Sequence, residues 1–311
     1  MYKGHRISVV IPAHNEAAHV AKVIRGLPAF VDHILVVDDA SSDGTAEAAL
    51  SCQDARLELL KNPGNLGVGG TTLKGYERSL ALGADIAVKM DGDDQMSPEY
   101  LPLLLDALIE EGADYSKGNR FLAGESLEAM PKLRLFGNIA LTFLTKLASG
   151  YWHIFDPQNG YTAVKSRALR ALNREKIHRG FFFENDVLIH LSLLNFKVKD
   201  VPIPARYQDE KTDLNPLKVG LTFPFLLVRR FAARIYQKYI LRDFSPIALF
   251  FILGGLLFLW GLGFGTYLWV HTKVTGLPTP TGTIMLSLLP LILGFQLLLQ
   301  AVVLDIQETP R

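Results

Sequence analysis

Hydrophobic and polar positions divide the chain into two parts with different patterns. Up to about residue 210, short apolar runs alternate with longer stretches of mixed polarity. This alternation predicts an α/β domain, a parallel sheet with helices on both faces. Helices are expected between the strands, including 98–111, 133–148 and 181–195. The expected strands are residues 7–11, 33–37, 57–60, 85–90, 114–117, 161–165 and 197–205, the last at an edge because prolines interrupt it.

Beyond Asp243 the pattern changes to that of a membrane protein. Residues 244–270 and 282–304 carry no charged side chain, and each run exceeds the roughly 20 residues that cross a bilayer. The connector 271–281 is short, so we expect two transmembrane helices that form a hairpin, followed by a short tail, 305–311.

A basic segment, residues 213–243, precedes the first expected span. Arg230, Arg234, Lys238 and Arg242 recur every four residues and predict one helical stripe. A basic stripe of this kind is typical of an amphipathic helix that lies among anionic lipid headgroups. By the positive-inside rule, the domain of residues 1–212 and the tail are expected in the cytoplasm.

Composition excludes several classes of protein. The net charge is +1, so no overall field favours a nucleic acid partner. Cys52 is the single cysteine, which excludes an internal disulfide framework and a cysteine-rich zinc site. The glycines of residues 64–70 do not have the dinucleotide-binding spacing, and they follow the third expected strand instead of the first.

Polar clusters follow three of the expected strands: Asn15-Glu16, Asp38-Asp39 and Asp91-Gly92-Asp93. Carboxyl ends of parallel strands share one edge of a sheet, where ligands bind. Asp91 and Asp93 are two residues apart on a turn and suit Mg²⁺ or Mn²⁺ held together with substrate phosphates. Taken alone, such a pair is more typical of a solvated acidic turn. The convergence of the three clusters favours the metal site.

Three motifs together resemble those of a known family. Residues 8–16, 36–45 and 91–95 are similar to the family 2 glycosyltransferases of the GT-A fold, in the polyprenyl-phosphate branch that resembles dolichol-phosphate mannose synthase. The resemblance covers about residues 5–211. It implies a Rossmann-like nucleotide-diphospho-sugar transferase domain and a divalent metal cofactor, Mg²⁺ or Mn²⁺.

The resemblance also implies roles for individual residues. The metal ligands would be Asp91, Asp93 and Gln95. The acceptor phosphate would meet Arg120, Arg134 and Arg206. The nucleotide would contact Pro12, Ala13, Asn15, Glu16, Asp38, Asp39, Asp91 and Lys211. The catalytic group would comprise Asp93, Arg120, Arg134, Glu184 and Asp186, with Glu184 and Asp186 orienting the acceptor or sugar, or serving as a base.

The expected function is an inverting, metal-dependent sugar transfer. The donor would be a nucleotide-sugar, GDP-mannose or a UDP-hexose, and the acceptor undecaprenyl or dolichyl phosphate. The enzyme would be a multi-pass protein of the inner (cell) membrane with its catalytic domain in the cytoplasm, and a homo-oligomer is compatible with the sequence. Two alternatives stay open: a transferase that elongates a cell-envelope glycan or glycolipid, and a non-catalytic membrane scaffold of the same fold.

Overall fold

The computed structural model describes residues 1–121, 132–204 and 216–310. These residues form two compact units, Met1–Arg230 with the C-terminal end, and Phe231–Thr309. The division falls inside a helix, later in the chain than the 212/213 boundary expected from the sequence.

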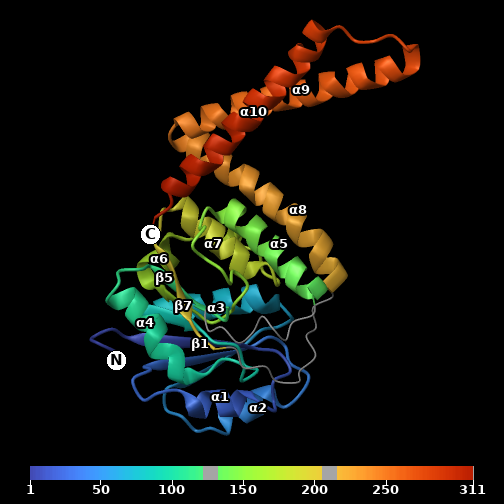
Figure 1. Ribbon diagram of the computed structural model, residues 1–311. Coiled ribbons are helices and arrows are strands. Elements are labelled where there is room, and N and C mark those ends of the chain that lie inside the picture. The colour runs from blue at the N-terminus through green and yellow to red at the C-terminus, as the bar shows by residue number, and fades with distance from the viewer. Residues whose placement is uncertain (122–131, 205–215, 311) are drawn as a thin grey trace. The chain divides into compact units, whose positions relative to one another are not determined.

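The first unit contains a seven-stranded sheet (Figure 1). Its strands are β1 (Ile7–Ala13), β2 (His33–Asp38), β3 (Leu57–Lys61), β4 (Ile86–Lys89), β5 (Tyr115–Asn119), β6 (Thr162–Lys165) and β7 (Val198–Pro202). Its helices are α1 (Val20–Gly26), α2 (Thr45–Leu50), α3 (Gly67–Ala81), η1 (Pro98–Tyr100), α4 (Leu101–Ile109), α5 (Lys132–Ser149), α6 (Ser166–Ala171), η2 (Arg174–Lys176), α7 (Phe183–Leu193) and most of α8 (Pro216–Ile235).

The strand order is β3-β2-β1-β4-β6-β5-β7. All neighbouring pairs are parallel except those of β6, which runs antiparallel to both β4 and β5. The expectation of an all-parallel sheet is therefore wrong at β6. A short apolar run such as Thr162–Lys165 carries no signal of strand direction. The edge position expected for the last strand is confirmed, because β7 ends the sheet.

Two hydrophobic cores cover the two faces of the sheet. On one face, Val9 and Ile11 of β1 pack with residues of α1, α2 and α4. On the other face, Val10 of β1 packs with residues of α3, α6 and α7. In Figure 1, α1 and α2 accordingly lie on the side of the sheet opposite α3. All seven residues of β1 are buried, as expected for the central strand of a two-sided layer.

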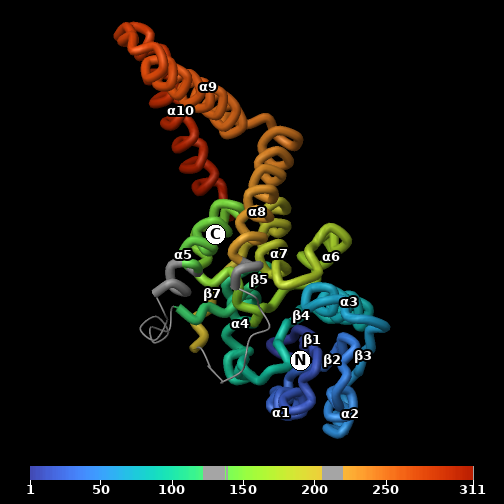
Figure 2. Tube along the Cα trace, turned by 90° about the vertical axis from the view of Figure 1, so that its right-hand side faces the viewer, coloured from blue at the N-terminus to red at the C-terminus, as the bar shows by residue number. Residues whose placement is uncertain are grey.

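The second unit contains a π-helical segment, η3 (Tyr236–Arg242), and two long helices, α9 (Pro246–Thr275) and α10 (Thr281–Gln307). By length and composition, both are long and apolar enough to cross a membrane. They form an antiparallel hairpin, visible in Figure 2. Gly261 and Gly265 lie at their contact: an added Cβ would lie 2.6 Å from the Leu291 nitrogen and 2.5 Å from the Ser287 Oγ, respectively. Both predicted spans lie largely within these helices, and the helices continue beyond them.

The expected basic stripe does not face lipid along its whole length. Arg234 is fully buried and makes two hydrogen bonds to Asp305 of α10, of 2.8 and 2.7 Å. The Tyr239 hydroxyl also donates to Asp305. The prediction was wrong for Arg234 because a helical period reveals which residues share a face, but not what covers that face. Asp305, expected in the tail, belongs to α10.

We predict that Gly75→Ala destabilises the first unit. Gly75 of α3 lies against β1, and an added Cβ would lie 2.2 Å from Val10 Cγ1. Overpacking of this kind costs about 1–3 kcal/mol. The measurement is the midpoint of thermal unfolding of the full chain in detergent. Gly137→Ala in α5 is the control, because nothing lies within 4 Å of its added Cβ. Equal midpoints for the two variants would contradict the packing explanation.

Candidate active site

The carboxyl ends of β1, β2 and β4 lie side by side at one edge of the sheet. Ala13 at the end of β1 is paired with Asp38 of β2, and Val10 is paired with Lys89 of β4. Gly92, in the turn after β4, lies against the end of β1: an added Cβ would lie 3.4 Å from Glu16 Cγ and 3.5 Å from Ala13 Cβ. The shared edge predicted from the three polar clusters is confirmed.

Backbone strain marks the three turns. Asn15, Ala40 and Asp94 each follow one of these strands, and each has a positive φ of 59°, 56° or 60°. Such conformations are costly for residues other than glycine and concentrate at functional sites. Asp94 is buried and forms an ion pair with Lys22 of α1, which anchors the turn after β4. Asp94, for which the sequence patterns indicate no role, therefore has a structural one.

Hydrogen bonds join the turn after β1 to the turn after β2. The Asn15 Oδ1 accepts from the Ser42 amide at 2.9 Å, and the Asn15 amide donates to the Ser41 Oγ at 3.0 Å. The Glu16 amide donates to the Thr45 Oγ1 at 2.8 Å. Together these bonds hold the turn after β2 against the turn that follows Pro12 and Ala13 at the end of β1.

Asp38 and Asp39 have different surroundings, although both are buried. Asp39 accepts from the amides of Leu66 and Gly67 at 2.8 and 2.9 Å, and from the side chain of Asn62 at 2.7 Å. It therefore anchors the loop that leads into α3. Asp38 accepts from the Ser41 amide at 3.1 Å through Oδ1. Asp38 thus stabilises its own turn, whereas Asp39 connects that turn to the start of α3.

A buried lysine, Lys89, contacts two of the predicted site residues. Its Nζ lies 2.6 Å from Asp91 Oδ1 and 3.2 Å from Glu184 Oε1 of α7, and its side chain is 1% exposed. Burial acts to lower the pKa of Lys89, but the two carboxylates outweigh it and raise the pKa above its ordinary value. The sequence patterns do not assign Lys89 to the site. The signal in the sequence that could have indicated its role is a charged residue at the end of an apolar strand, two residues before Asp91.

The turn after β4, residues 91–95, is called the acidic turn. Its side chains are of the kind that bind a divalent cation together with a substrate. Asp93 Oδ1 accepts from the Gln95 amide at 3.1 Å, and Asp91 and Asp93 are both partly exposed. The described residues contain no group of three or more His, Cys, Asp or Glu placed to hold a metal. Mg²⁺ is commonly bound by one or two carboxylates together with substrate phosphates and water, and Asp91 and Asp93 fit that arrangement.

Arg120, at the end of β5, is held by the buried carboxylate of Asp156. Its Nε and Nη2 donate to the two Asp156 oxygens at 2.8 and 3.0 Å. Burial acts to raise the pKa of Asp156, but the hydrogen bonds and charge of Arg120 outweigh it and lower the pKa. The Arg120 side chain remains 38% exposed, so a fixed cation faces solvent. Arg134 lies in the first turn of α5, but the structure describes only its backbone. Arg206 and Lys211 lie outside the described residues.

Glu184 and Asp186, two residues apart in α7, point to different partners. Asp186 is fully buried and accepts from the His178 amide at 2.8 Å and from Arg230 Nη2 of α8 at 2.7 Å. Glu184 pairs with Lys89 instead. The structure joins only Glu184 to the acidic turn. Asp186, which the sequence placed in the catalytic group, anchors α8.

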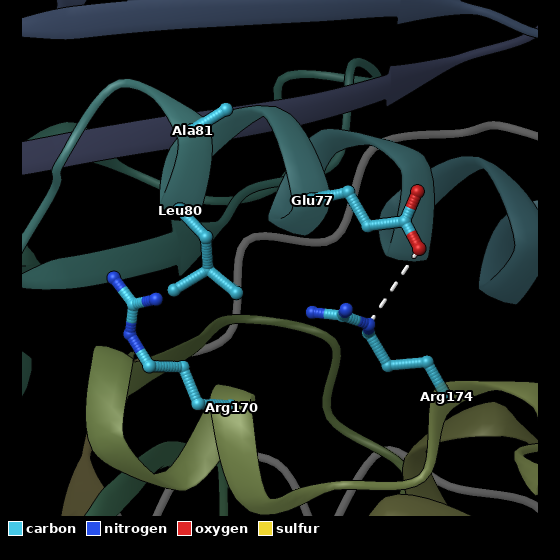
Figure 3. Close-up of a pocket in the computed structure, with 5 residues that line it drawn as sticks. All are labelled: Glu77, Leu80, Ala81, Arg170 and Arg174. Atoms are coloured by element: carbon cyan, nitrogen blue, oxygen red, sulfur yellow. Dashed lines mark ion pairs between the residues drawn. The ribbon is translucent and has the colours of Figure 1, made fainter.

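The cavity in Figure 3 belongs to a different region of the unit. It lies between the C-terminal half of α3 and α6 and has a volume of about 300 Å³. Arg174 reaches toward Glu77 across it, with an Nε–Oε1 distance of 3.5 Å, and Arg170 lies beside Leu80. Among the predicted site residues whose side chains the structure describes, none lines this cavity. The candidate site therefore rests on the edge of the sheet and not on the cavity.

Comparison with known proteins identifies the class. Residues 8–172, more than half of the chain, match the model of Glycosyl transferase family 2, and the chain belongs to that family. It is a glycosyltransferase. A polyprenol monophosphomannose synthase from Mycolicibacterium smegmatis is 32% identical over 207 residues, which cover 64% of this chain and 76% of that protein. A dolichyl-phosphate hexose transferase from Haloferax volcanii is 30% identical over 221 residues, with coverages of 69% and 89%.

Solved structures agree on the fold. Glucosyl-3-phosphoglycerate synthase from Mycobacterium tuberculosis, crystallised with Mn²⁺, UDP and phosphoglyceric acid, has a TM-score of 0.56 at 22% identity. The match covers 74% of this chain and 78% of that one. At this identity the similarity shows the GT-A fold alone.

We predict a distinct pH dependence of stability from Lys117 of β5. Lys117 is fully buried, and burial is the main reason that its pKa falls from 10.5 to about 8, although nearby carboxylates oppose the fall. Between these two values the unfolded chain binds more protons than the folded chain, so Lys117 makes stability rise with pH across that interval. The midpoint of thermal unfolding, measured from pH 8 to pH 10, should rise more steeply in the wild type than in Lys117→Met. Lys74→Met, at a partly exposed lysine, is the control, and equal slopes for wild type and Lys117→Met would contradict this assignment.

Proposed function

We propose that this chain is a metal-dependent glycosyltransferase of the membrane surface that transfers a sugar from a nucleoside-diphosphate donor to a polyprenyl phosphate. The strongest support is the single edge where β1, β2 and β4 end: Asp38 is the last residue of β2, and Asp91 and Asp93 follow β4. Relatives named for transfer to dolichyl and polyprenyl phosphates support the acceptor. The two long apolar helices suit an enzyme whose acceptor lies in a membrane.

The reaction needs one bond made and one bond broken. An oxygen of the acceptor phosphate attacks the anomeric carbon while the bond from that carbon to the diphosphate oxygen breaks. The electron pair leaves with the nucleoside diphosphate, and attack opposite the leaving group inverts the configuration. A phosphate monoester has a second pKa of about 6. The nucleophile is thus already ionised at neutral pH, and no general base is required.

Acidic and neutral residues of the site have different proposed roles. Asp91 and Asp93, with Gln95 beside them, would hold Mg²⁺ or Mn²⁺, which when bound supplies positive charge to the leaving diphosphate. Glu184 is paired with the Lys89 ammonium, which favours an orienting role over that of a base. Asp38, with Pro12, Ala13, Asn15 and Glu16, would line the nucleotide pocket.

Arginine offsets the repulsion between the two anionic substrates. Arg120 is oriented by its two hydrogen bonds to Asp156, so little side-chain entropy would be lost when its exposed part meets a phosphate. Arg134 and Arg206 are proposed as further contacts to the acceptor phosphate, and Lys211 as a contact to the diphosphate.

We further propose that the catalytic unit faces the cytoplasm at the inner membrane. Arg229 and Arg242 are exposed and precede α9, and positive charge before a span favours the cytoplasmic side. In this orientation the short connector between α9 and α10 lies on the opposite side.

The proposal predicts sugar transfer that depends on Asp91. The purified full chain, in vesicles that contain undecaprenyl or dolichyl phosphate, is given Mn²⁺ and radiolabelled GDP-mannose, UDP-glucose or UDP-N-acetylglucosamine. One donor should yield a labelled lipid that mild acid cleaves. Asp91→Asn should lower the rate about 10²–10³-fold, because it weakens charge stabilisation of the leaving group. A chelator should abolish the transfer.

Glu77→Gln is the control, because Glu77 lies in the cavity between α3 and α6 and should leave the rate unchanged. Absence of transfer from every donor would reject the proposal. A labelled product that resists mild acid would favour elongation of a glycan or glycolipid. Full activity of Asp91→Asn would remove the acidic turn from the mechanism.

A further inference from the structure

Lys89 places a fixed positive charge inside the candidate donor site. Its Nζ contacts Asp91 Oδ1 from β4 and Glu184 Oε1 from α7, at 2.6 and 3.2 Å. The ammonium therefore connects the turn that would hold the cation to a helix on the other side of the site. Its side chain is 1% exposed, so solvent does not screen this charge from Asp91.

The surroundings fix the ammonium in place. A Cβ added to Gly160 would lie 2.6 Å from Lys89 Nζ and 2.7 Å from Asp91 Oδ2. The backbone at Gly160 thus closes directly over the ion pair, and the Gly160 carbonyl lies 3.5 Å from Nζ. The Gly160 segment therefore limits movement of the buried Lys89 ammonium, while the Asp91 side chain stays 29% exposed.

A second buried lysine, Lys117, has different contacts from Lys89. Lys117 of β5 is equally buried, but its Nζ donates to the backbone carbonyls of Asp156 and Asn159, at 2.5 and 2.9 Å. Lys117 holds a loop, whereas Lys89 forms ion pairs with two carboxylates, one of them a proposed metal ligand. The two lysines therefore form a natural pair for comparison.

We propose that Lys89 is a positioning residue that acts as the internal counter-ion of the donor site. It orients Asp91 and offsets its charge, so that a divalent cation binds firmly only together with the diphosphate. The physical reason is repulsion: a cation at Asp91 lies near the Lys89 ammonium, and the negative diphosphate removes that disadvantage. The inference rests on the proposed function, since it takes the metal–diphosphate site as its starting point.

This arrangement would link metal binding to the substrate. Without nucleotide, Lys89 neutralises Asp91 in place of the metal. With a nucleoside diphosphate present, the phosphate oxygens supply both ligands and negative charge. After transfer, loss of the nucleoside diphosphate would also weaken the hold on the cation, which would favour release of both together.

The test measures Mn²⁺ binding instead of turnover. The full chain in detergent is titrated with Mn²⁺, and free Mn²⁺ is followed by electron paramagnetic resonance, without nucleotide and with UDP or GDP. Lys89→Met and Lys89→Gln both remove the charge, and Lys89→Gln keeps a hydrogen-bond donor. Each should bind Mn²⁺ without nucleotide at least about tenfold more tightly than the wild type, with a smaller change when nucleotide is present.

Three further variants separate charge from structure. Lys89→Arg keeps the charge and should restore the wild-type preference for Mn²⁺ with nucleotide. Lys117→Met should leave that preference unchanged. Glu184→Gln leaves Lys89 with one carboxylate, so Mn²⁺ binding without nucleotide should weaken by about tenfold. This last variant keeps the test decisive even where neutral substitutions of Lys89 fail to fold.

The outcomes distinguish the inference from the proposed function. Wild-type protein that binds no Mn²⁺ even with UDP or GDP would reject the metal site itself. Wild-type protein that binds Mn²⁺ with nucleotide, while Lys89→Gln or Lys89→Met binds it no more tightly than wild type without nucleotide, would reject only the role of Lys89. Unchanged Mn²⁺ binding by Glu184→Gln would reject it as well.

Discussion

The burial of β1 on both faces is the constraint on which the candidate site depends. Val9 and Ile11 belong to one core and Val10 to the other, so the strand cannot shift by one residue without exchanging its faces. Its register fixes β2 on one side and β4 on the other. The turns that follow these three strands are held in position by that register. A site of hydrophilic side chains is thus placed by apolar ones.

The unit contains several buried charges, and each is satisfied in a different way. Lys89 is balanced by two carboxylates, Asp156 by the guanidinium of Arg120, and Asp39 by backbone amides. A buried ion pair adds little net stability compared with apolar packing, but removal of one partner costs about 3–5 kcal/mol. Such pairs therefore fix geometry more than they stabilise the fold. Lys89, Asp39 and Arg120 each lie at or directly after the carboxyl end of a strand, so these contacts fix the turns that form the candidate site.

Much of the fold could be predicted because apolar runs and helix periods are local signals. The seven strands, the edge position of β7 and the two long apolar helices all follow from such patterns. The direction of β6 could not be predicted, since Thr162–Lys165 has the same pattern in either direction. The edge bearing Asp38 and Asp91 was predictable because parallel strands share it. The roles of Lys89, Asp39 and Arg234 were not, because each depends on a partner distant in the sequence.

The first turn of α7 links two parts of the catalytic unit through two neighbouring side chains. Glu184 points to Lys89 and the acidic turn, while Asp186 holds Arg230 of α8. Both carboxylates belong to one helical turn, so the position of α8 at Arg230 and the position of Glu184 are fixed by the same rigid element. The chain continues from α8 through η3 into α9, the first of the two apolar helices. The pairing of Asp186 with Arg230 therefore joins α8 to the same helical turn that carries Glu184 toward the acidic turn.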